Sequence, residues 1–197
     1  MLRPDLALIY GWVTSGSHIL DLGCGGGELL EALTQHKQTT GYGLEIDPAR
    51  INICLARGIS VIEQDINAGL HNIRDNAFDM VIMTQALQVL KRPDKALDEM
   101  LRIARECIIT FPNFAYWRHR LHLGIKGRMP VSQALPHAWY DTPNIHLSTL
   151  KDVEQLCAMR GYTIRNRAVS KNGSLGRWTH RTWPSMLSCT AIFRICR

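Results

Sequence analysis

The sequence predicts an α/β fold of the Rossmann-like type, with a doubly wound, mostly parallel sheet of seven strands. Three observations lead to this prediction. Short apolar runs alternate with amphipathic helical segments along most of the 197 residues. A turn rich in glycine follows the first apolar run. Acidic residues follow the next two runs, at the positions where nucleotide-binding sheets place ligand contacts.

The first predicted unit is a strand, a glycine turn and the start of a helix. The apolar run 18–20 precedes residues 21–27, which read Asp-Leu-Gly-Cys-Gly-Gly-Gly, and the helix begins at Glu28. Glycine adopts positive φ angles and lets the backbone lie against a ligand, while free N–H groups at a helix start suit an anion. We therefore expect a nucleotide-like cofactor here, in contact with Asp21, Gly23, Cys24, Gly25 and Gly27.

The glycine spacing separates two kinds of cofactor. The dinucleotide fingerprint Gly-x-Gly-x-x-Gly/Ala ends in a small residue and places a pyrophosphate at the helix N-terminus. Counted from Gly23, that last position holds Glu28, whose carboxylate would oppose a pyrophosphate but tolerate a sulfonium cation. With Asp21 included, the turn resembles motif I of the class I S-adenosylmethionine-dependent methyltransferases. The resemblance favours S-adenosylmethionine or S-adenosylhomocysteine as the cofactor.

The second and third predicted strands both end in acid. The second ends at Glu45, whose carboxylate can accept hydrogen bonds from both ribose hydroxyls of an adenosine. The third, residues 61–64, ends at Asp65, where the methyltransferase superfamily commonly places an acid that binds the adenine amino group. Ile46 and Ile66, which follow the two acids, complete the expected adenosine contacts.

Four further strands are expected at 78–84, 107–111, 162–169 and 190–195, the last two as an antiparallel pair. Signals at helix ends place three helices between the strands. Asp47 caps a helix that Pro48 opens, another starts near Pro93, and Thr149 with Asp152 forms the capping pattern of a third. The helix after Pro93 carries apolar residues at spacings of three and four, namely Leu97, Met100, Leu101 and Ala104.

Residues 84–88, directly after the fourth strand, bear on catalysis. We expect Thr84 and Gln85 to contact the cofactor, but the side chains of Gln85 and Gln88 are amides, which orient a substrate and cannot take a proton. The sequence patterns of enzymes that methylate nucleic-acid bases are absent at this point. No catalytic residue is therefore assigned. A general base can still come from His119, His137, Tyr140 or His146.

Residues 1–197 are expected to form one domain, with an insertion at about 112–145. A connection of this length between a strand and a helix is uncommon in compact α/β domains and is usually functional. The segment is rich in aromatic residues and histidine, so it can cap the cofactor cleft or contact a partner.

Charge, cysteine and hydropathy limit the other possibilities. The net charge of +6 includes basic groups at 118–128 and 165–181. Such groups can follow an RNA backbone but are more often solvated faces or protein contacts, so nucleic-acid binding is not favoured. Six cysteines without a Cys-x-x-Cys pair indicate reduced thiols, no metal site and a cytoplasmic protein. No apolar run approaches the length of a membrane span.

Several stretches resemble the MetW family of bacterial methionine-biosynthesis proteins. They are 21–25, 84–88, 111–118, 127–131, 134–136 and 139–145, and the Trp-Tyr-Asp-Thr-Pro-Asn sequence in the last is far more specific than the glycine turn. The resemblance covers residues 2–161, and the stretch after Val169 departs from it. It implies a methyltransferase-like fold that acts beside a homoserine O-acyltransferase in the first committed step of methionine synthesis.

Two functions follow from the resemblance. In the first, the protein binds S-adenosylmethionine and is a partner of the homoserine O-acyltransferase, with the insertion as its contact surface. In the second, it is an active methyltransferase that acts on a small molecule. Methylation of RNA is a third and less favoured possibility.

Overall fold

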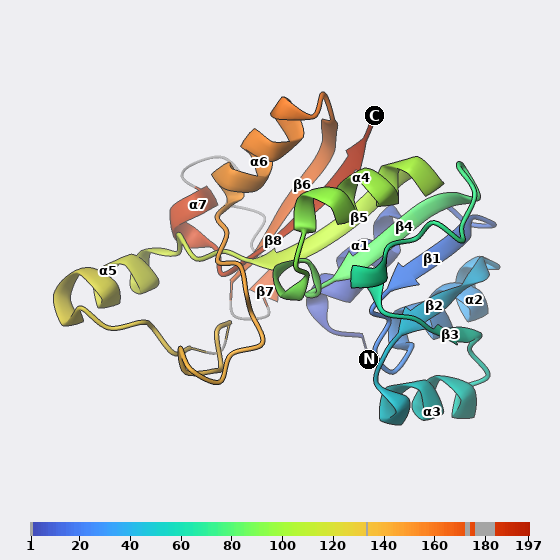
Figure 1. Cartoon of the computed structure of the whole chain (residues 1–197), viewed down its shortest axis with the longest axis horizontal. Helices are drawn as coiled ribbons and strands as arrows, with labels where there is room; N and C mark the ends of the chain where they lie inside the picture. The colour runs from blue at the N-terminus through green and yellow to red at the C-terminus, as the bar shows by residue number, and fades with distance from the viewer. Residues whose placement is uncertain (1, 133, 172–173, 176–183) are drawn as a thin grey trace.

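The computed structural model describes residues 2–132, 134–171, 174–175 and 184–197. Within these residues, eight strands form one sheet in the order β3-β2-β1-β4-β5-β8-β6-β7 (Figure 1). The strands are β1 (His18–Leu22), β2 (Thr40–Glu45), β3 (Val61–Glu63), β4 (Phe78–Thr84), β5 (Ala104–Pro112), β6 (Thr163–Lys171), β7 (Ser174–Leu175) and β8 (Thr190–Cys196).

Seven of these strands are the predicted ones. Strands β1 to β5 pair in parallel, and β8 lies antiparallel between β5 and β6, which confirms the mostly parallel sheet with a final antiparallel pair. The short β7 pairs with the end of β6 and adds an eighth strand. Two residues are too few to show an alternating apolar pattern, so the sequence gives no sign of it.

Helices cover both faces of the sheet, as the doubly wound prediction requires. The helices are α1 (Pro4–Trp12), α2 (Glu28–Lys37), α3 (Pro48–Ala56), α4 (Pro93–Ile103), α5 (Trp117–Lys126), α6 (Leu150–Met159) and α7 (Pro184–Leu187). Residues of α1, α2 and α3 pack with Ile19 of β1, while residues of α4 and α6 pack with Leu20 on the other face. Successive side chains of a strand point to opposite faces, so β1 contributes to both cores.

The predicted helix starts are confirmed. The Asp47 carboxylate accepts a hydrogen bond from the Ala49 amide at 2.9 Å, and Thr149 with Asp152 forms a reciprocal capping box. Helix α4 begins at Pro93 as expected but ends at Ile103, so placing Ala104 on this helix was wrong. Ala104 opens β5 with extended backbone angles and is buried in the same core as Leu97. Ala104 therefore continues the apolar spacing of the helix although it lies on a strand.

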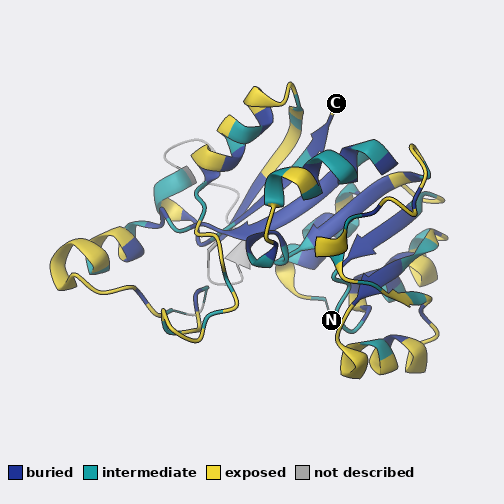
Figure 2. Ribbon diagram, in the orientation of Figure 1, coloured by how far each residue is buried: buried dark blue, intermediate teal, exposed yellow. Residues whose placement is uncertain are grey.

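Residues 117–132 and 134–147 form a projection that we call the arm. It comprises α5 and an irregular segment that returns toward the sheet, and it extends away from the sheet at the left of Figure 1. Figure 2 shows the contrast between the buried central strands and the largely exposed arm. On α5 only His119 is buried. The arm therefore contributes little to the core of the sheet.

In the described part of the chain, no helix combines the length and apolar composition that a bilayer span requires. Two residues of the second basic group, Arg177 and Arg181, lie outside the described residues.

Candidate cofactor cleft

A cleft of about 650 Å³ lies at the carboxyl ends of β1, β2 and β4. The chain order of the strands reverses here, because β1 has β2 on one side and β4 on the other. Ligands of open α/β sheets bind at such a switch point, where the loops on the two sides diverge. Ten of the eleven predicted cofactor contacts line the cleft: Asp21, Gly23, Cys24, Gly25, Glu45, Ile46, Asp65, Ile66, Thr84 and Gln85. Contact of these residues with a cofactor stays a prediction.

The eleventh residue, Gly27, does not line the cleft. It precedes α2 with a φ of 75°, and a Cβ atom built there would lie 3.1 Å from the Cys54 sulfur on α3. Gly27 therefore lets α2 begin close to α3. A second glycine of this kind, Gly43 on β2, leaves room for the Cys24 side chain, since a Cβ there would lie 2.3 Å from its sulfur. Neither packing role is visible in the sequence pattern.

The glycine turn is held by backbone hydrogen bonds to β2. The amides of Gly23 and Cys24 both donate to the Leu44 carbonyl, at 2.8 and 3.1 Å. Gly23 and Gly25 have φ angles of 70° and 59°, which favour glycine because a Cβ is strained there. The turn is thus fixed at the carboxyl ends of β1 and β2 without a ligand.

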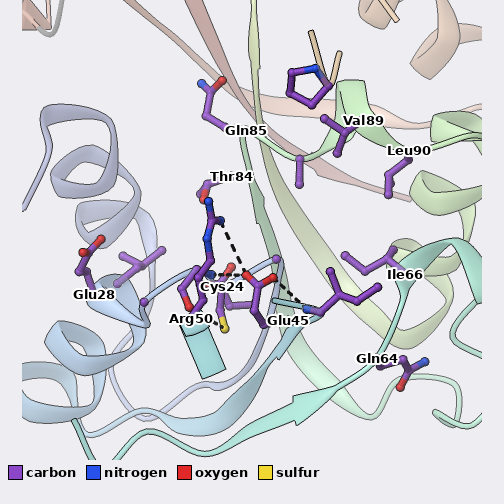
Figure 3. Close-up of a pocket in the computed structure, with 18 of the residues that line it drawn as sticks. Cys24, Glu28, Glu45, Arg50, Gln64, Ile66, Thr84, Gln85, Val89 and Leu90 are labelled. Carbon is purple, nitrogen blue, oxygen red and sulfur yellow. Dashed lines mark hydrogen bonds and ion pairs between the residues drawn. The ribbon is translucent and has the colours of Figure 1, made fainter. Parts of the chain in front are cut away.

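Glu45 joins this turn to the loop that follows β2 (Figure 3). The carboxylate is 6% exposed and accepts three backbone hydrogen bonds, from Gly25 at 2.9 Å, Ile46 at 2.8 Å and Asp47 at 3.1 Å. The Arg50 guanidinium lies 3.9 Å away. A carboxylate offers about four acceptor positions, so Glu45 keeps capacity for a ribose hydroxyl. Its role in organising the loop was missed, because the sequence shows the acid but not the amides that converge on it.

Asp21 is the most perturbed acid of the cleft. Its side chain is buried, and Oδ1 makes no hydrogen bond with the described residues. Burial, with a smaller effect from the charge of Glu45, raises the pKa of the Asp21 carboxyl to about 7. An unpaired buried carboxylate is costly. A cationic group bound beside Asp21 would remove that cost.

Gln85 and Gln88 have different environments although both follow β4. Gln85 lines the cleft with a φ of 55°, and its backbone amide donates to the Thr110 hydroxyl at 2.9 Å. Gln88 is buried, and its side-chain nitrogen donates to the Gln85 carbonyl at 2.8 Å. Gln88 therefore supports the backbone of Gln85 and does not face the cleft.

None of the four candidate bases lines the cleft. His119 is buried against Tyr116, with ring centroids 5.3 Å apart, and burial lowers its pKa. His137 lines a separate pocket in the arm, while Tyr140 and His146 are exposed. The cleft-lining residues include no histidine, tyrosine or lysine among the described part of the chain. In this structure none of the four residues is positioned to act as a base in the cleft.

Thirteen lining residues were not predicted, and four of these come from two segments that carry no predicted contact. Arg3 and Leu6 come from the start of the chain, and Pro143 and Asn144 come from the returning part of the arm. The sequence signal for the last two was present, since they belong to the specific stretch 139–145. The sequence left open whether that stretch caps the cleft or contacts a partner. Groups of three or more metal-ligating side chains are absent from the described residues.

Comparison with solved structures defines the class of fold. A S-adenosylmethionine-dependent methyltransferase from Archaeoglobus fulgidus superposes with a TM-score of 0.71 at 14% identity, over 99% of this chain and 92% of the other. A methyltransferase of the same kind from Mesorhizobium loti gives 0.71 at 14% identity, over 98% of each chain. The chain therefore has the class I methyltransferase fold.

The sequence comparison is more specific. The family model described as "Methionine biosynthesis protein MetW" matches residues 3–195, and the chain belongs to this family. The match extends beyond Gly161, where we expected the resemblance to end, and includes the stretch after Val169, so the expectation that this stretch departs from the family was wrong.

Two curated relatives extend the comparison. The "Bifunctional methionine biosynthesis protein MetXA/MetW" of Rhodopirellula baltica is 39% identical over 172 residues, 83% of this chain and 28% of the relative. The 18S rRNA (guanine(1575)-N(7))-methyltransferase of Saccharomyces cerevisiae is 34% identical over 85 residues, 42% of this chain and 30% of the relative. The matched part thus spans less than a third of each relative's length.

Proposed function

We propose that this protein binds S-adenosylmethionine or S-adenosylhomocysteine in the cleft and is a partner of a homoserine O-acyltransferase in methionine biosynthesis. The observation that carries the cofactor assignment is the pair of buried carboxylates, Asp21 and Glu45, on the wall of a cleft at the switch point of the sheet. The observation that favours the partner is the relative in which a MetW unit is joined to a MetXA unit.

The lining residues divide among the parts of such a cofactor. Glu45 would accept a hydrogen bond from a ribose hydroxyl, and Asp65 with Ile66 would contact the adenine. Asp21 would pair with the α-ammonium group of the methionine moiety, which removes the cost of its unpaired oxygen. Four carboxyl side chains line the cleft, against the guanidinium groups of Arg3 and Arg50, so a cationic sulfonium suits it better than a pyrophosphate.

The chemistry of the acceptor side favours partnership over methyl transfer. Gln85 and Asn144 border the cleft with neutral amides, and the candidate bases lie elsewhere. Transfer to an alcohol or an ammonium group needs a general base within hydrogen-bond reach. The alternative function, methylation of a small molecule, is consistent with the fold and is best suited to an acceptor that is already a good nucleophile.

The partnership is tested by mixing the purified chain with the homoserine O-acyltransferase of the same organism. We expect the two proteins to co-elute in size-exclusion chromatography and the acylation rate to rise. Absence of a complex, with an unchanged acylation rate, would overturn the proposed partnership. Release of S-adenosylhomocysteine that depends on a specific small-molecule acceptor would instead establish the alternative.

A further inference from the structure

The arm contains a second pocket, of about 170 Å³, which we call the arm pocket. Its lining is mainly apolar and includes Met129, Leu135, Trp139 and Ile145. Asn144 lines both the arm pocket and the cofactor cleft. The two cavities therefore share a wall.

The shared wall belongs to residues 143–146, which we call the strap. Pro143 and Asn144 line the cofactor cleft, and the amides of Ile145 and His146 both donate to the backbone carbonyl of Gln88, at 2.9 and 3.0 Å. The side-chain nitrogen of Gln88 donates to the backbone carbonyl of Gln85 at the rim of the cleft. Two hydrogen bonds to a single carbonyl thus fix the strap next to residues that would meet the cofactor.

The surface around the arm pocket has the character of a protein contact. The side chain of Trp139 is 76% exposed, Ile145 60% and Val131 59%. Exposed aromatic and aliphatic side chains around a pocket are typical of binding hot spots. In the sequence of the arm, Asp141 is the single acidic residue, against the positive charges of Arg118, Arg120, Lys126 and Arg128. Such a surface fits an acidic protein face with a projecting apolar side chain.

We propose that the arm pocket receives an apolar side chain of the homoserine O-acyltransferase, and that a cofactor in the adjacent cleft strengthens this contact through the strap. The inference rests on the proposed function, which supplies the occupant. The acyltransferase is favoured over RNA because the exposed side chains include the aliphatic residues Val131 and Ile145, whereas single-stranded nucleic acid binds chiefly by base stacking on aromatic rings.

The sign of the coupling follows from the shared wall. A cofactor packed against Pro143 and Asn144 holds the strap in place, so the partner meets a pocket that is already formed. Less ordering is then required when the partner binds, which raises its affinity. Because linkage is reciprocal, the partner raises cofactor affinity by the same factor. We expect a factor of at least about five, within the range typical of such coupling.

The experiment measures the affinity of the full chain for the acyltransferase of the same organism, with and without saturating S-adenosylhomocysteine. The wild-type chain is expected to bind at least about fivefold more tightly with the cofactor present. Trp139→Ala should weaken binding about tenfold or more in both conditions, as expected for a hot-spot residue. Met159→Ala, which removes a side chain that is 75% exposed on α6, should leave binding unchanged.

A matched pair of substitutions isolates the strap. Ile145→Pro removes one of the two amides that donate to the Gln88 backbone carbonyl, and the ratio of affinities with and without cofactor should fall toward one. Ile145→Ala removes more of the side chain but keeps the amide, so it should weaken docking and preserve the ratio. Thermal unfolding of both variants checks that they are folded.

The outcomes are separable. If the wild-type chain does not bind the acyltransferase at all, the proposed partnership and this inference both fail. If it binds equally well with and without cofactor, the coupling fails while the partnership stands. If Trp139→Ala binds like the wild type, the arm pocket is not the docking site. Binding of single-stranded RNA that Trp139→Ala abolishes would assign the arm to nucleic acid and overturn the proposal.

Discussion

The cleft has two walls that are fixed to the sheet in different ways. The wall formed by the glycine turn and β2 is joined to the sheet, because amides of the turn donate to the Leu44 carbonyl and the Glu45 carboxylate. The wall formed by the strap returns from an exposed arm and donates to the Gln88 carbonyl. The first wall is therefore part of the folded core, while the second is an addition that can respond to a ligand or a partner. Substitutions in the two walls should differ accordingly.

Among the residues of the cleft, the largest effect is expected for Glu45→Ala, which leaves three backbone amides without their acceptor. We expect the free energy of unfolding to fall by on the order of 3 kcal/mol, and cofactor affinity to fall by at least about tenfold. Chemical denaturation and calorimetry measure the two losses. The control is Glu63→Ala, at the paired position on β3 but exposed, which should change stability by less than about 0.5 kcal/mol. Equal losses for the two variants would contradict the role assigned to Glu45.

Two glycines with positive φ compare the sheet side of the cleft with the arm. A Cβ atom added to Gly27 (φ 75°) would lie 3.1 Å from the Cys54 sulfur, whereas a Cβ added to Gly127 (φ 59°) in the arm would meet open space. Gly27→Ala should therefore cost about 2–3 kcal/mol, from backbone strain and crowding together, and Gly127→Ala only about 1 kcal/mol from strain alone. Denaturant titration of both variants provides the test. A larger loss for Gly127→Ala would show that the arm is more tightly packed than described.

Asp21→Asn is expected to stabilise the protein without ligand above neutral pH. The Asp21 carboxyl has a pKa of about 7 when folded and 3.8 as its ordinary value. The folded chain therefore binds this proton more tightly, and wild-type stability falls as pH rises from about 4 to about 7. The variant lacks this dependence, so its advantage should grow between pH 5 and pH 8 by on the order of 2 kcal/mol. Urea unfolding at both pH values measures it, and a constant difference would contradict the raised pKa.

The smallest effect is expected on the arm. The Ile125 side chain is 73% exposed, so Ile125→Ser should change the free energy of unfolding by less than about 0.5 kcal/mol. Its counterpart Leu33→Ala, fully buried on α2, should cost about 2–5 kcal/mol. Thermal unfolding distinguishes the two. A clear loss for Ile125→Ser would mean that α5 packs on the sheet.

The same contrast explains what the sequence could and could not predict. Residues 78–84 match β4 because a buried parallel strand leaves a continuous apolar run. The cap of Asp47 and the glycine turn are equally local signals. The contact of Asn144 with the cleft depends instead on how a long irregular segment returns to the sheet. Such a return involves residues far apart in the chain and leaves no periodic pattern.

Residues with two compatible roles are a second limit of the sequence. Gly27 fits both a cofactor loop and a close helix contact, and the structure adds the contact with Cys54, which the sequence does not show. His119 fits a base and a core residue, and its burial against Tyr116 decides for the core. Cys54 is distant in sequence from Gly27, and a single buried histidine leaves no periodic pattern.

The central claim is that the cleft binds S-adenosylmethionine or its product, and calorimetric titration of the wild-type chain tests it most directly. S-adenosylhomocysteine and S-adenosylmethionine should both bind with a stoichiometry of about one, and NAD should give no heat of binding, because Glu28 stands where a pyrophosphate needs a small residue. Tight binding of NAD, or no binding of either S-adenosyl compound, would contradict the account.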